Sequence, residues 1–118
     1  MASSGTIKEI STCPKTPNCV SSLTDSKKHF MDPWENSGED VLKRIKKAAF
    51  TEPRSKLISE SPTHLHFTFK SFVFRFVDDV WFAVEGDKVH FKAAARLGRK
   101  DFDMNKKRMN RIKGKVYR

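Results

Sequence analysis

The 118-residue chain has only two cysteines and no apolar run close to the length of a membrane span. A transmembrane helix needs about 18 to 20 consecutive apolar residues, so the sequence predicts none. A zinc site needs about four ligands, and two cysteines with four scattered histidines fit that requirement poorly. We therefore predict no membrane-spanning segment, no metal site and no cofactor.

Familiar catalytic motifs are missing as well. The chain contains no Walker loop, no dinucleotide-binding glycine pattern, no nucleophile elbow and no His-Glu-x-x-His sequence. Its first ten residues, MASSGTIKEI, lack the basic start and apolar stretch of a secretory signal. The sequence thus indicates no class of enzyme, and it fits either a cytoplasmic protein or the mature form of an exported one.

Positive charge is what the chain has in excess. Its 24 lysines and arginines outnumber 14 acidic residues, and the net charge is +10. From Arg96 to the C-terminus there are 10 basic and 2 acidic residues. Such a distribution favours an anionic partner without identifying it.

Hydrophobic periodicity predicts two helices. Over 37–50, Val41, Leu42, Ile45 and the pair Ala48–Ala49 recur at helical spacing, with Ser37 as the expected N-cap. Pro53 ends this helix, because the residue before a proline is disfavoured in the helical conformation. A second apolar stripe, interrupted by Asn105, predicts a helix over 103–115.

Between these helices the apolar residues alternate instead. This pattern is typical of antiparallel strands with one covered face, and the sequence Glu85-Gly86-Asp87 predicts a hairpin turn between two of them. We predict an α+β fold: a single antiparallel sheet of four to five strands covered on one face by two helices. Residues 1–12 are expected to form a flexible arm, residues 13–118 the domain, and residues 1–28 little regular structure.

Cys13 and Cys19 flank a proline-containing turn, CPKTPNC. The turn can bring them close enough to form a disulfide, which would contribute roughly 2 kcal/mol in the chain-entropy model. Two reduced thiols in a structured loop fit the sequence equally well, because the compartment is not known.

Three segments carry a family resemblance. CPKTPNCVSS at 13–22, FRFVDDVWF at 74–82 and ARLGRKDFDMNKKR at 95–108 resemble the domain-of-unknown-function family numbered fourteen ninety-nine, found in bacteria and photosynthetic eukaryotes. The resemblance implies no known reaction, and many relatives look secreted or membrane-tethered. Trp81 replaces a glutamate of the family pattern, and Ala93 and Ala95 replace serines. A chemistry that used those groups in relatives would be lost here.

The acidic pair Asp78–Asp79 is the strongest candidate for a site. Neighbours on a strand point to opposite faces, so the two carboxylates cannot flank one substrate. Asp78 shares its face with apolar residues and needs a cationic partner, for which Arg96 and Arg108 are the candidates. One interpretation is a structural ion pair between sheet and last helix, and the other is a polar ligand pocket of Asp78, Arg96, Asn105 and Arg108.

Two further groupings are weaker. Arg96, Gly98, Asp101, Asn105 and Arg108 fit either an anion-binding nest at a helix start or a cross-braced helix cap. His64, His66 and His90 lie on the mixed faces of strands, where solvent-exposed histidines are more common than metal ligands.

These observations favour a small non-enzymatic binding or accessory domain with an anionic partner. A ligand-processing enzyme built on the Asp78 pocket is the alternative. Nonspecific nucleic-acid binding is a third hypothesis, since Lys70 to Phe76 interleaves basic and aromatic residues. The basic helix would equally suit an anionic membrane, or serve only solubility.

Overall fold

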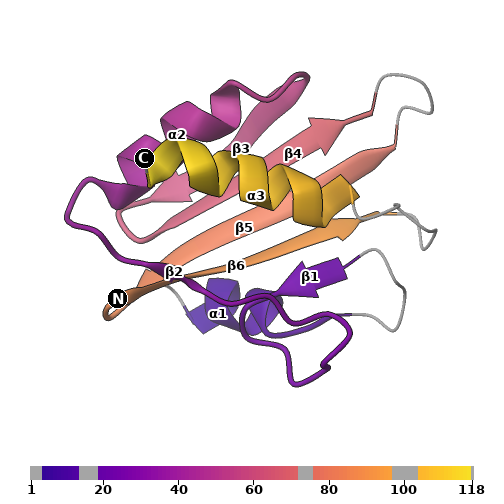
Figure 1. Ribbon diagram of the computed structural model, residues 1–118, viewed down its shortest axis with the longest axis horizontal. Coiled ribbons are helices and arrows are strands. Elements are labelled where there is room, and N and C mark those ends of the chain that lie inside the picture. Colours follow the sequence, from indigo (N-terminus) through magenta and orange to yellow (C-terminus); the bar gives the residue numbers. More distant parts are fainter. Residues whose placement is uncertain (1–3, 14–18, 72–75, 97–103, 118) are drawn as a thin grey trace.

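The described part of the chain forms a six-stranded antiparallel sheet with three helices (Figure 1). The computed structural model describes residues 4–13, 19–71, 76–96 and 104–117. The strand order is β1-β6-β5-β4-β3, and β2 also pairs with β6. The α+β class is therefore confirmed. The elements are α1 (Ser4–Ile10), β1 (Cys19–Ser21), β2 (Trp34–Glu35), α2 (Val41–Phe50), β3 (Ser55–Ser61), β4 (His64–Lys70), β5 (Val77–Glu85), β6 (Lys88–Ala95) and α3 (Met104–Val116).

Alternating residues of the central strands build the core. Side chains from one face of the sheet pack with apolar side chains of α2 and α3 in a single buried cluster. Trp34 from β2 joins this cluster and contacts the rings of Phe82 and Phe91. The fully or almost fully buried members include Ile45, Ala49, Leu65, Phe67, Phe69, Val80, Phe82, Val89, Phe91, Met109 and Ile112.

The helix expected over 37–50 begins later, at Val41. Its N-cap position is occupied by Asp40, which forms no side-chain capping bond, and the hydroxyl of Ser37 instead accepts a hydrogen bond from Arg44. Gly38 has a φ of 139°, which no helical residue adopts, so the helix cannot extend back to Ser37. The predicted N-cap at Ser37 is therefore wrong. The end at Phe50, with Thr51 as C-cap ahead of Pro53, agrees with the prediction.

A tight turn joins β5 and β6 at the predicted position. Glu85 and Lys88 are paired across the strands, which leaves Gly86 and Asp87 as the two turn residues. Gly86 has a φ of 62°, the left-handed conformation that two-residue hairpin turns require.

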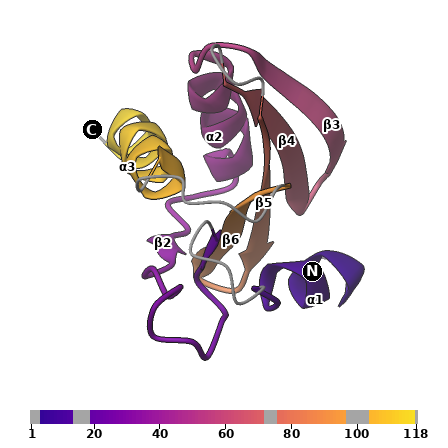
Figure 2. The same cartoon turned by 90° about the vertical axis from the view of Figure 1, so that its right-hand side faces the viewer.

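The first 28 residues contain more structure than the sequence indicates. Figure 2 shows α1 on the opposite side of the sheet from α2 and α3. Ile10 is fully buried there, and its carbonyl accepts a hydrogen bond from the Ser21 hydroxyl. The expectation of irregular structure is wrong for residues 4–10, because contact with the sheet stabilises a helix too short to form alone. The division into arm and domain stays a prediction.

A disulfide joins Cys13 to Cys19, with the two Cα atoms 5.9 Å apart. It links the segment that follows α1 to the first residue of β1. Of the two states that the sequence allows, the structure therefore has the oxidised one. The bridge anchors the N-terminal segment to the edge of the sheet.

Candidate anion-binding site

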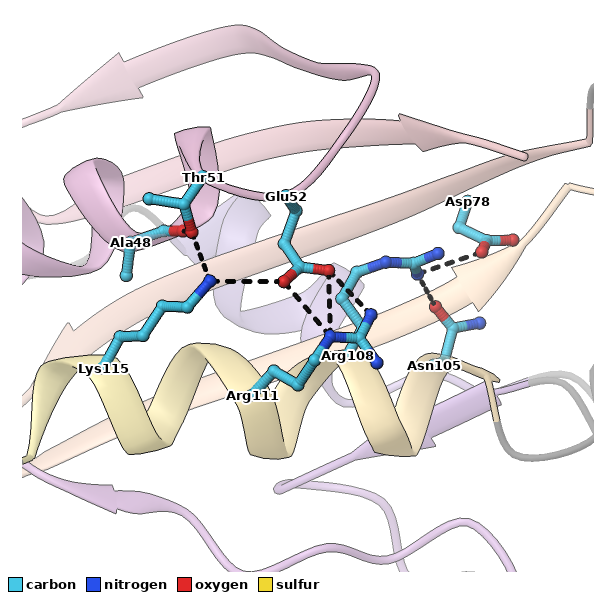
Figure 3. Close-up of polar contacts among 8 residues, drawn as sticks. All are labelled: Ala48, Thr51, Glu52, Asp78, Asn105, Arg108, Arg111 and Lys115. Carbon is cyan, nitrogen blue, oxygen red and sulfur yellow. Dashed lines mark hydrogen bonds and ion pairs between the residues drawn. The ribbon is translucent and has the colours of Figure 1, made fainter. Parts of the chain in front are cut away.

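Asp78 lies in a buried polar cluster under α3. Its Oδ2 accepts a hydrogen bond from Arg108 Nη1 at 3.0 Å, and the same nitrogen donates to Asn105 Oδ1 at 2.8 Å (Figure 3). Arg108 also lies over the ring of Phe69, 4.8 Å from its centroid. Asn105 is fully buried and the other two side chains are nearly so. The cluster fixes α3 against β5 by charge-assisted bonds.

Asp79, the next residue, points to the opposite face. Its carboxylate accepts hydrogen bonds from Arg96 Nε at 2.8 Å and interacts with His66 Nε2 at 2.9 Å. Burial acts to raise the pKa of Asp79, but the bonds from Arg96 and His66 outweigh it and hold the pKa below its ordinary value. The suggestion that Arg96 reaches Asp78 is wrong, since strand alternation places the two on opposite faces.

The predicted pocket is therefore divided between two faces. Asp78, Asn105 and Arg108 come together, while Arg96 joins Asp79 on the other side of the sheet. Gly98 and Asp101 lie outside the described residues, so the nest that would include them stays a prediction.

The histidines of the strands have separate partners. His66 stacks on Trp81 besides contacting Asp79, His64 lies 2.5 Å from the Ser61 hydroxyl, and His90 lies 3.0 Å from the Ser22 hydroxyl. Burial lowers the pKa of His90. Within residues 4–13, 19–71, 76–96 and 104–117, no three His, Cys, Asp or Glu side chains gather as metal ligands would.

A second polar cluster, centred on Glu52, joins α2 to α3 (Figure 3). Arg111 donates to its carboxylate at 2.7 to 3.3 Å, and Lys115 Nζ lies 3.6 Å away while it donates to the Thr51 hydroxyl. Burial acts to raise the pKa of Glu52, but Arg111 above all, with Lys115 and Arg108, keeps the pKa below its ordinary value.

The two helices that this cluster joins are strongly basic. They lie side by side in Figure 1, α2 with four lysines and arginines, α3 with six, and neither with an acidic residue. Between them is an open hollow of about 310 Å³, lined by Arg44, Lys47, Ala48, Thr51 and Lys115. Its lining supplies three cations and one hydroxyl group. This arrangement can bind an anion.

Comparison with protein families places the chain. The model of a family described as "Protein of unknown function (DUF1499)" matches residues 9–116. The chain belongs to the DUF1499 family. The resemblance found in the sequence is thereby confirmed, and the match spans both polar clusters and both basic helices. No curated protein matches this DUF1499 chain.

In this DUF1499 protein, sequence reasoning missed Glu52 and the hollow beside it. A usable signal was present. Arg44, Lys47, Ala48 and Thr51 follow the i, i+3, i+4, i+7 spacing of one helix face, and Glu52 is the first acidic residue after four cations. Over the described residues, no helix of the DUF1499 chain is long and apolar enough for a membrane span.

Proposed function

We propose that this protein is a small non-enzymatic binding domain that attaches to an anionic partner through the face formed by α2 and α3. One observation carries the proposal: two adjacent helices hold ten basic residues between them and no acidic one. Several of these cations form ion pairs within the fold, and those that do not are available to a partner.

The available cations are exposed lysines on both helices. They form no hydrogen bond or ion pair within the part of the chain that the structure describes, so partner binding would break no native contact. A surface of this kind attracts polyanions and releases their counterions on binding, which makes affinity fall steeply as salt rises. These lysines are Lys43, Lys47, Lys106, Lys107 and Lys113.

The enzyme alternative has weaker support. Its four residues are divided between the two faces of the sheet, and the buried Asp78 carboxylate is already held by Arg108. A catalytic acid or base must reach a substrate, and this carboxylate is 13% exposed. The geometry favours a structural role for the pair, so binding is the better-supported function.

The proposal is tested by charge reversal on the basic face. The triple variant K106E/K107E/K113E should weaken binding to vesicles of phosphatidylcholine with phosphatidylglycerol, and to duplex DNA, at least tenfold at 50 mM NaCl. The wild-type affinity itself should fall steeply between about 50 and 200 mM NaCl. Cosedimentation and fluorescence anisotropy measure the two affinities, and the ratio between vesicle and DNA binding identifies the kind of partner.

A matched control variant has the same net charge as K106E/K107E/K113E. The variant K27E/K28E/K56E reverses three exposed lysines outside α2 and α3. It should retain most of the wild-type affinity if the face, rather than overall charge, binds. Equal loss in both triple variants, or affinity that does not change with salt, would refute the proposal.

A further inference from the structure

The hollow between α2 and α3 has the composition of a small anion site. Its α2 side is one helix face, formed by Arg44, Lys47, Ala48 and Thr51, and Lys115 approaches it from α3. Ala48 is the small residue of this face, and its lack of a long side chain leaves space between the longer cationic ones. Figure 3 shows Lys115 reaching across to Thr51 beside Ala48.

Two of the three cations are held in place. Arg44 contacts the Ser37 hydroxyl, donates to the Val116 carbonyl at 3.4 Å, and pairs with Asp40 at 3.3 Å. Lys115 is fixed by the Thr51 hydroxyl. Such preorganisation reduces the entropy that a ligand would otherwise lose in ordering these side chains. Lys47 is exposed and has no partner among the described residues, so its ammonium group is available to an incoming anion.

The charge around the hollow is positive by two units. Four cations are counted: the three that line the hollow and Arg111, which pairs with Glu52 beside it. The carboxylates of Asp40 and Glu52 offset two of these four positive charges. Glu52 lies 2.7 Å from Arg111 and 3.6 Å from Lys115, so two cations share this one carboxylate. An anion with two negative charges at neutral pH would balance the site.

We infer that this hollow binds a phosphate monoester group, with Lys47, Lys115 and Arg44 as its cationic ligands. The inference rests on the proposed function, since it names the chemistry that the basic face selects. A monoester carries about −1.5 to −2 charges at pH 7 and three acceptor oxygens, whereas a phosphodiester carries a single charge. Lysines bind phosphate as point charges, and the arginine fork adds directed donors.

The test compares two probes that differ by one methyl group. Methyl phosphate is a monoester and dimethyl phosphate is a diester. Titration into ¹⁵N-labelled protein should shift the amide signals of Lys47 to Thr51, with the monoester binding about tenfold more tightly. Monoester affinity should also fall between about pH 7 and pH 5, because its second pKa is about 6.

Matched variants locate the site. K47Q removes a lining cation and should weaken methyl phosphate binding about tenfold, as expected for loss of one charge-assisted bond. K43Q removes an exposed lysine of the same helix that does not line the hollow, and it should change affinity less than twofold. Both substitutions are on the surface, so circular dichroism should show that both variants fold.

Two vesicle compositions identify the source of the phosphate. Vesicles with phosphatidic acid present a monoester headgroup, and vesicles with twice the mole fraction of phosphatidylglycerol match its charge with diesters. Preference for phosphatidic acid that is lost in K47Q supports a lipid source, and binding of methyl phosphate alone supports a free one. Equal binding of both methyl phosphates, or equal effects of K47Q and K43Q, would overturn the inference. Neither result would affect the salt-dependent binding tested above.

Discussion

Asp78 and Asp79 show how one residue of offset changes the role of a carboxylate. Asp78 faces the apolar core, where a charge is stabilised only by a close partner, and Arg108 supplies it at 3.0 Å. Asp79 faces α1 and the partly exposed side of the sheet, where Arg96 is 57% exposed. Loss of the Asp78–Arg108 pair should therefore lower the free energy of unfolding more than loss of the Asp79–Arg96 pair.

Replacing Asp78 by asparagine should destabilise the fold by about 3 to 5 kcal/mol. The substitution keeps the shape of the side chain but leaves the buried Arg108 guanidinium without its counter-charge, and an uncompensated buried charge is costly. Urea unfolding followed by tryptophan fluorescence measures the loss. Asp79→Asn is the control, because the exposed Arg96 is hydrated without its partner, and a smaller loss than in Asp78→Asn is expected. Equal losses in the two variants would contradict this assignment.

The sequence contained enough to separate these two partners. Alternation predicts opposite faces for Asp78 and Asp79, as observed. Ala93 and Ala95 lie on the same face of the sheet as Asp78. Alternation therefore places the next residue, Arg96, on the opposite face, which is the face of Asp79. The choice of Arg108 for Asp78 depends on how α3 lies over the sheet, and helix packing of that kind is not encoded in local spacing.

At the scale of the elements, length decided what could be predicted. The long strands and the helices near 37–50 and 103–115 have enough residues for their period to appear. The short elements α1, β1 and β2 have no readable period and form because β5 and β6 offer them contacts. The start of α2 was predicted wrongly for a different reason. The conformation of Gly38, rather than the capping ability of Ser37, sets the residue at which this helix begins.

The disulfide should matter chiefly for α1 and β1. In C13S/C19S the unfolded chain gains the entropy of an opened ring, so the free energy of unfolding should fall by roughly 2 kcal/mol. Hydrogen exchange should show lost protection in α1 and β1, with β4 and β5 unchanged relative to global stability. Reductant should lower the stability of the wild type by a similar amount and leave the variant unaffected. Uniform loss of protection over the whole sheet would contradict the local role.

At the scale of the whole molecule, the two faces of the sheet are held by different electrostatics. The α2 and α3 side combines an apolar core with an outer surface of cations, and Glu52 is the carboxylate that links the two helices. The α1 side carries Asp79 with Arg96 and His66, and Lys92, nearly buried, pairs with Glu9 above Trp81. The chain has 24 basic and 14 acidic residues, so few other carboxylates can take over when one that pairs with several cations is lost.

Acid should therefore unfold the protein through Glu52 and Asp79. The pKa of each lies below its ordinary value in the folded state. The unfolded chain then binds more protons than the folded one in the acidic range, so stability decreases as the pH falls from about 5 toward 3. The lowered pKa of His90 contributes an earlier decrease near pH 6, because the unfolded chain protonates this ring first.

Denaturant titrations at a series of pH values should show that E52Q and D79N each flatten the acidic part of the profile. E60Q, which removes an exposed carboxylate paired with Lys46, is the control for the loss of one negative charge. A flat wild-type profile below pH 5 would show that neither carboxylate contributes as its contacts imply.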